Sequence, residues 1–200
     1  MNRVKTTLLA AISIALAFTF SCSGDDGGSS SSGTFKDSRD GKTYKWVKIG
    51  DQTWMAENLN FEGSSAYFQA SSTACYNNNS SNCDAYGRLY NWHAALNACP
   101  PGWHLPTDAE WTVLTDFVGT DPGTKLKAAS GWNSGGNGTD EFGFSALPGG
   151  GGWDGSFARV GSEGFWWSAT GFNTSDAWYW SMSMSRSNKL GLNSVRCVKN

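Results

Sequence analysis

Apolar residues alternate with polar ones in the first part of the chain that has a clear pattern, which starts at Thr34. In residues 44–50 the β-branched Val47 and Ile49 lie two positions apart and therefore face the same side of an extended chain. The pattern predicts a strand here. Gly50 and Asp51 supply a turn, and residues 52–55 return as the second strand of a hairpin. Later strands are predicted at residues 164–169, 177–184 and 195–198.

Two segments carry apolar residues at three- and four-residue spacing, which predicts helices. The first covers residues 87–98 and ends before Pro100. The second begins at Thr107, whose hydroxyl forms a capping box with Glu110, and it stops at Gly119. Residues 62–84 read as a long polar loop, and after Ser130 glycine, asparagine and serine alternate with aromatic residues. The predicted class is α+β, with two helices packed on small antiparallel sheets and long Gly/Asn/Ser-rich loops.

The N-terminus has the pattern of an export signal. Arg3 and Lys5 precede an apolar stretch at residues 8–20, which is too short to span a bilayer, and Ser21 precedes Cys22. This resembles a lipobox, so residues 1–21 are predicted to be a lipoprotein signal peptide and Cys22 the lipidated residue. A plain secretory signal is the alternative. In both cases the domain leaves the cytoplasm.

The segment after the cysteine has no apolar residue. Residues 22–33 are therefore predicted to form a flexible tether between the lipid and a domain at residues 34–200. Asp25 and Asp26 resemble the signals that send some lipoproteins to the outer face of the outer membrane, although two acids also simply solubilise a linker. The expected location is the cell envelope, on an outer-membrane lipid anchor and exposed at the surface.

Charge argues against nucleic acid as a partner. The chain has 15 basic and 17 acidic residues, and loss of Arg3 and Lys5 with the signal leaves 13 against 17, a formal charge of −4. Nucleic-acid binding needs a basic patch that displaces counterions.

Four cysteines remain beyond Cys22, and an even number in an exported chain predicts disulfides. Three pairings are possible. We favour Cys75–Cys83, which closes a short polar loop, and Cys99–Cys197, which ties the middle of the domain to its last strand. A zinc site is the alternative, but no pair has the usual close spacing and the chain has two histidines.

Four ordered segments resemble the Fibrobacter succinogenes major paralogous domain family. They are TFKDSRDGKTYKWVKIGDQTWMAENLNF, CPPGWHLPTDAEWTVL, GFSALPGG with GFWWSAT, and the terminal VRCVK. Family members are mostly exported lipoproteins or parts of surface proteins whose biochemical role is unassigned. A more distant similarity, in GWHLPTDAEW and VRCVK, is to the formylglycine-generating enzyme and C-type-lectin-like folds. It implies a C-type-lectin-like domain with paired N- and C-terminal strands and a ligand site on long loops.

Catalysis has little support in the sequence. The formylglycine-generating enzymes use a pair of reactive cysteines that bind copper, whereas Cys99 and Cys197 occupy positions that are typical of a structural bridge. His93 and His104 lack a nucleophile motif, and each is expected to pack or cap. The positions of acidic residues along the sequence do not by themselves establish the pair of carboxylates that glycoside hydrolysis requires. The protein is expected not to be an enzyme, with a degenerate or active formylglycine-generating-enzyme-like protein as an alternative.

Binding is the leading interpretation, because sugar sites combine aromatic platforms with polar partners. The candidate platforms are the aromatic residues near glycine-rich loops, namely Trp132, Trp153, Phe157, Trp167 and Tyr179. Core packing is the alternative for each. No cofactor is required, although Asn137, Asp140 and Glu141 carry oxygens that suit calcium; a solvated loop is the other interpretation. The predicted ligand is a polysaccharide or surface glycan, and a scaffold that binds a surface protein is a further alternative.

Overall fold

The computed structural model describes residues 31–63 and 72–200. The predicted signal peptide at residues 1–21, the lipidation site Cys22 and nearly all of the tether lie outside the described residues. One boundary differs from expectation. The first strand begins at Ser32 rather than after residue 33, because the backbone of this polar segment pairs with the next strand.

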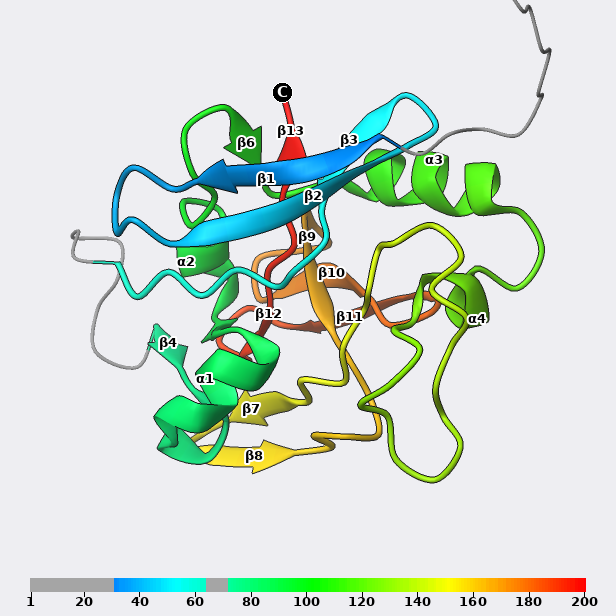
Figure 1. The fold of residues 1–200 in the computed structure, drawn as a ribbon. Helices are drawn as coiled ribbons and strands as arrows, with labels where there is room; N and C mark the ends of the chain where they lie inside the picture. The colour runs from blue at the N-terminus through cyan, green and yellow to red at the C-terminus, as the bar shows by residue number, and fades with distance from the viewer. Residues whose placement is uncertain (1–30, 64–71) are drawn as a thin grey trace, which may run out of the picture.

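A five-stranded sheet holds both ends of the described chain (Figure 1). Its order is β1-β2-β3-β13-β6, where the strands are β1 Ser32–Lys36, β2 Thr43–Ile49, β3 Gln52–Met55, β13 Val198–Lys199 and β6 Trp103–His104. The predicted hairpin is confirmed, since Ile49 pairs with Gln52 across the turn. Val198 pairs with both Trp54 and His104, so the last strand lies between early and middle segments.

A second sheet has six strands in the order β11-β10-β9-β12-β5-β4. They are β11 Met184–Asn188, β10 Asp176–Trp180, β9 Trp166–Gly171, β12 Asn193–Ser194, β5 Leu89–Tyr90 and β4 Thr73–Ala74. The single strand predicted at residues 177–184 is wrong. The chain turns at Met182, whose φ is 70°, and continues as β11.

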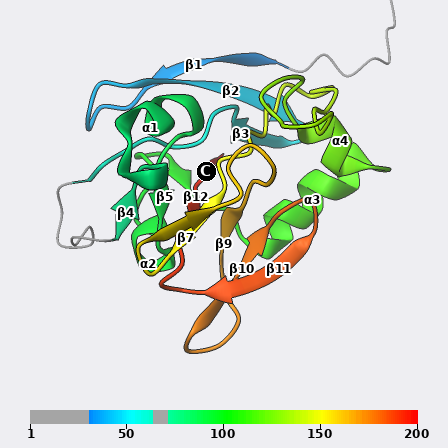
Figure 2. The ribbon, with the colours of Figure 1, turned by 90° about the horizontal axis from the view of Figure 1, so that it is seen from below.

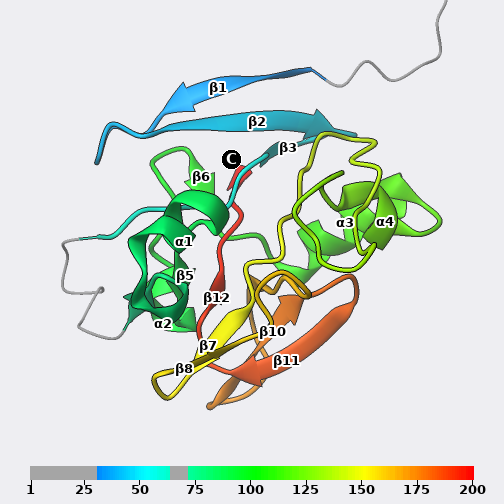
Figure 3. The same cartoon turned by 60° about the horizontal axis from the view of Figure 1, so that its bottom comes forward.

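A short hairpin of β7 Gly151–Trp153 and β8 Ser156–Ala158 stands apart from both sheets. It is attached to the second sheet by two backbone hydrogen bonds, in which Gly152 and Leu192 each donate to the other's carbonyl. Figures 2 and 3 show that this hairpin lies at the end of the domain away from β1 and β2, beside the β9–β11 strands.

The helices are short, and only the longest was fully predicted. This is α3 Asp108–Val118, with the expected capping box at Thr107 and Glu110. The helix predicted at residues 87–98 is wrong in its first part, where β5 pairs with β12 and β4 and only α2 Trp92–Ala95 is helical. The predicted loop 62–84 contains β4, the 3₁₀ turn η1 Tyr76–Asn78 and most of α1 Ser80–Tyr86. The remaining helix is α4 Pro122–Leu126.

The core between the sheets is aromatic. Trp111 stacks on Trp180 with ring centroids 5.0 Å apart, and Trp54 and Phe144 pack around this pair. At the centre lies Arg196, which is fully buried. Its guanidinium donates to the Asn58 side-chain oxygen at 2.7 and 3.1 Å and to three backbone carbonyls, those of residues 55, 144 and 145.

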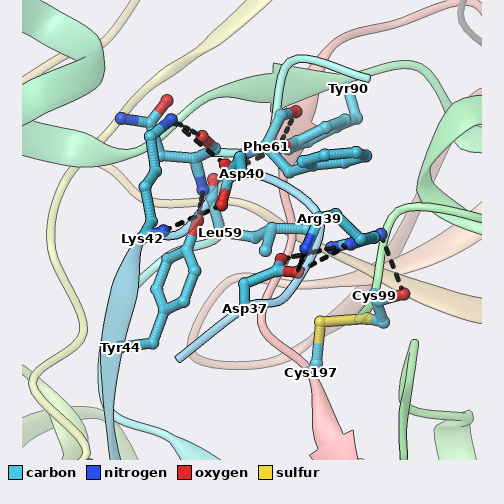
Figure 4. Close-up of polar contacts among 11 residues, drawn as sticks. Asp37, Arg39, Asp40, Lys42, Tyr44, Leu59, Phe61, Tyr90, Cys99 and Cys197 are labelled. Carbon is cyan, nitrogen blue, oxygen red and sulfur yellow. Dashed lines mark hydrogen bonds and ion pairs between the residues drawn. A yellow bond between two sulfur atoms is a disulfide. The ribbon is translucent and has the colours of Figure 1, made fainter. Parts of the chain in front are cut away.

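Both predicted disulfides are present, Cys75–Cys83 and Cys99–Cys197. Beside the second, the turn between β1 and β2 is tied down by Asp37, which accepts hydrogen bonds from the Arg39 side chain at 2.7 to 3.1 Å (Figure 4). Arg39 also donates to the Cys99 carbonyl at 3.2 Å and lies 3.7 Å from the centre of the Phe61 ring. The hydrogen bond from Arg39 to the Cys99 carbonyl joins the turn between β1 and β2 to the long disulfide. The fold is thus mixed α and β, with small sheets and few helices.

Candidate functional site

The β7–β8 hairpin ends in a tight turn. Its two-residue turn is Asp154-Gly155, and both have positive φ, 48° and 74°, with Trp153 paired to Ser156 across the turn. This is the type I′ arrangement, which Asp-Gly favours because glycine and aspartate accept left-handed backbone conformations at low cost. Trp153, the last residue before the turn, remains 50% exposed.

One side of the hairpin borders a cavity of about 430 Å³, called hollow A here. Its walls combine aromatic rings with polar groups, among them Trp153, Phe157, Phe165, Tyr179, Asp154 and Asn193. Phe165 and Tyr179 meet edge to face at 5.6 Å. Because Gly151 and Gly152 carry no side chains, the rings of Phe165 and Phe157 approach the β7 backbone closely.

The wall of hollow A contains a hydrogen-bond donor without a partner. Asn193 lies on β12 and is only 7% exposed. Within the part of the chain that the structure describes, its side-chain nitrogen has no hydrogen-bond acceptor. A buried donor left unpaired costs about 1 to 3 kcal/mol, so a ligand oxygen that reached it would recover part of that cost.

The other side of the hairpin borders a second cavity of about 420 Å³, called hollow B here. It shares Trp153, Asp154 and Phe157 with hollow A. The rest of its wall comes from β4, from the end of η1, from the residue that caps α2 and from the segment around Leu190, which is 63% exposed. The hairpin therefore stands between two hollows.

The structure brings three of the five predicted platforms together. Trp153, Phe157 and Tyr179 all line hollow A. The predictions for Trp132 and Trp167 are wrong, because these side chains are 7% and 0% exposed. Their indole nitrogens donate to backbone carbonyls, Trp132 to Ala146 at 3.0 Å and Trp167 to Tyr90 at 2.7 Å, which satisfies the polar edge of each ring inside the core.

The calcium candidates are used in loop structure. The Asn137 side-chain oxygen accepts from the Trp132 backbone at 3.0 Å, and both carboxylate oxygens of Asp140 accept from Ser145, at 2.7 and 2.6 Å. Glu141 is exposed in the same loop. Residues 31–63 and 72–200 contain no group of three or more His, Cys, Asp or Glu side chains placed to hold a metal ion.

The histidines lie away from both hollows. His104 contacts Glu110 at 2.6 Å and Asn200 at 2.6 Å, one through each ring nitrogen, and His93 on α2 meets the Trp92 ring edge to face. Burial opposes ionisation of Glu110, but hydrogen bonds from Thr107 and His104 outweigh it and lower the Glu110 pKa. All four described cysteines are in disulfides, so none is present as a thiol.

Sequence reasoning missed Phe165, Asn193 and Leu190. A signal was available for the hairpin, because Asp154-Gly155 is a two-residue turn pair between Trp153 and Ser156. Nothing in the sequence marks Asn193, whose place in the wall depends on the pairing of β12 with β5.

Comparison with known proteins identifies the family of this chain. Residues 47–199 match the model of the Fibrobacter succinogenes major domain family, described as Fibrobacter succinogenes major domain. Neither a curated protein nor a solved structure matches the chain. The family match runs from within β2 to the end of β13, and so includes both disulfides and both hollows but leaves out β1. The chain therefore belongs to the Fibrobacter succinogenes major domain family.

Proposed function

We propose that the domain is a non-catalytic glycan-binding module, with hollow A as its primary site. The observation that carries the proposal is Trp153, a large aromatic side chain held half-exposed by a tight turn at the edge of a cavity. Exposing the apolar faces of such a ring to water is unfavourable in free energy. The ring becomes useful when the apolar face of a sugar covers it.

The other groups in hollow A suit the rest of a sugar. Tyr179 and Phe165 add apolar surface, whereas Asp154 can accept from hydroxyl groups and Asn193 can donate to a hydroxyl oxygen. Pockets for small ligands typically combine apolar walls with a few placed polar groups in this way. The support is therefore the combination of shape and chemistry, rather than the number of tryptophans.

The proposed setting is the bacterial cell envelope. Cys22 would carry the lipid, residues 23–30 would form most of the tether, and the domain would face outward. No helix in the described part of the chain is long and apolar enough to cross a membrane. We also propose a C-type-lectin-like arrangement, which the pairing of β13 with β3 supports, because it places the last strand in one sheet with the N-terminal strands.

Calorimetric titration with plant and bacterial polysaccharides, with and without calcium, tests the proposal. We expect saturable binding to at least one glycan. Trp153→Ala should weaken it roughly tenfold, since covering such a ring is worth about 1.5 kcal/mol. The control is Phe117→Ala, which removes another exposed ring, on α3 and outside both hollows. Failure of every glycan to bind, or equal losses in the two variants, would contradict the proposal.

A further inference from the structure

The two hollows share the β7–β8 hairpin as a common wall. Trp153, Asp154 and Phe157 line both of them. Neighbouring residues of a strand face opposite sides, so the two faces of the hairpin differ. A side chain at Gly151 would meet the Leu192 carbonyl and the side chains of Phe165 and Asn193, whereas one at Gly152 would meet the side chains of Phe157 and Leu192. Phe165 and Asn193 line hollow A, Leu192 lines hollow B, and Phe157 lines both.

The sizes of the hollows favour a ligand that uses both. Each is about 420 to 430 Å³, near the lower end of the roughly 300 to 1,000 Å³ found for small-ligand pockets. Together they lie in the upper part of that range. Trp153 offers apolar surface to both hollows, with Tyr179 in the wall of hollow A and the exposed Leu190 in the wall of hollow B.

The charges around the hollows favour a neutral ligand. The charged residues in the wall of hollow A are Asp154 and Arg159, and in hollow B Asp154 alone. Arg159 forms an ion pair with Glu163. No basic side chain of the described residues forms an ion pair with Asp154, so its charge dominates the shared wall and repels carboxylate or sulfate groups on a ligand.

We infer that the site binds a linear, uncharged oligosaccharide chain, which crosses the β7–β8 hairpin and places consecutive sugar units in hollow A and hollow B. This inference rests on the proposed function and adds the ligand's length and charge to it. Hollow A supplies the unpaired side-chain N–H of Asn193, which can donate a hydrogen bond to a sugar hydroxyl oxygen. Hollow B supplies the aliphatic surface of Leu190 and Leu192.

Length dependence is the first test. Neutral β-1,4-linked oligomers of glucose, xylose and mannose, from one to six units, are titrated by calorimetry into the purified protein. Affinity should rise with length until both hollows are filled. Leu190→Ala should weaken the longest oligomer that binds by about tenfold and leave the shortest unchanged, whereas Asn193→Ala should weaken both. The control Leu96→Ala changes an exposed leucine that lines neither hollow and should have no effect.

Charge is the second test. An oligogalacturonate of matched length should bind at least tenfold more weakly than the best neutral oligomer. Asp154→Asn should narrow that difference, and Asn-Gly keeps the same type of turn, so the hairpin geometry is preserved. Binding that is independent of length and insensitive to Leu190→Ala would overturn the inference while leaving hollow A as a glycan site. Equal affinities for the oligogalacturonate and the best neutral oligomer would overturn the inference that the ligand is uncharged. Absence of binding to any glycan would remove the proposed function and the inference together.

Discussion

The two disulfides should contribute unequally to stability, because they close loops of very different length. Cys99–Cys197 spans 98 residues and Cys75–Cys83 spans 8. In the chain-entropy model, a cross-link stabilises by restricting the unfolded chain, as −2.1 − 1.5R ln n in cal/mol/K. This gives about 4.7 kcal/mol for the long loop and about 2.5 kcal/mol for the short one. The long disulfide should therefore contribute about 2 kcal/mol more.

The comparison uses two double variants, Cys99→Ala with Cys197→Ala and Cys75→Ala with Cys83→Ala. Each loses two sulfur atoms, so much of the packing loss is common to both variants. The measured quantity is the free energy of unfolding in urea at pH 7, together with the slope against urea concentration, which shows whether the unfolded state has changed in extent. An equal loss in both variants, or a larger loss for the short pair, would refute the loop-entropy reasoning.

Two further predictions concern buried charges. Asp37→Asn should lower the free energy of unfolding by about 2 kcal/mol at pH 7, because Asp37 is buried and accepts hydrogen bonds from Arg39. Burial opposes ionisation of Asp37, but the bonds and charge of Arg39 outweigh it and lower the Asp37 pKa below 3.8. The advantage of the wild type should therefore be complete above about pH 4 and be lost as the pH falls through the lowered pKa; urea unfolding between pH 7 and pH 2 measures this, and a pH-independent difference would contradict it. Arg196→Met should cost about 3 kcal/mol, since it removes the guanidinium hydrogen bonds to three backbone carbonyls and to the Asn58 side-chain oxygen, which keeps the one from the Trp166 indole. Thermal unfolding followed by near-ultraviolet circular dichroism measures this, and a loss below about 1 kcal/mol would show that the pocket repacks around methionine.

Local signals predicted the elements that depend on local contacts. The capping box of Thr107 and Glu110 marks α3 because both hydrogen bonds form within one turn. The hairpin of β2 and β3 follows from the alternation at Val47 and Ile49 and the turn at Gly50, whose φ is 58°. The favoured disulfide pairing is correct: Cys75–Cys83 closes a short polar loop, and Cys99–Cys197 ties the middle of the domain to its last strand.

Long-range pairing decided the elements that local signals misassigned. Leu89 and Trp92 have helical spacing, yet Leu89 pairs with Ser194, which lies 105 positions away along the chain. A helix there would lose the link between β12 and β4. The tryptophans illustrate the same limit. Trp153 and Trp167 both follow glycine-rich sequence, but Trp167 lies on a strand in the interior of the six-stranded sheet, whereas Trp153 lies at the tip of a hairpin.

The C-terminal segment connects the candidate site to the core. Leu192 holds the β7–β8 hairpin through its backbone, Asn193 lines hollow A, Arg196 organises the centre of the core and Cys197 closes the long disulfide. The support of the site is therefore part of the most constrained stretch of the chain. Two of the residues that would contact a ligand, Trp153 and Asp154, lie instead at the exposed turn of the β7–β8 hairpin. Changes at the tip can then alter which ligand binds while the core contacts stay intact, because the tip contributes little to the buried network that holds the fold.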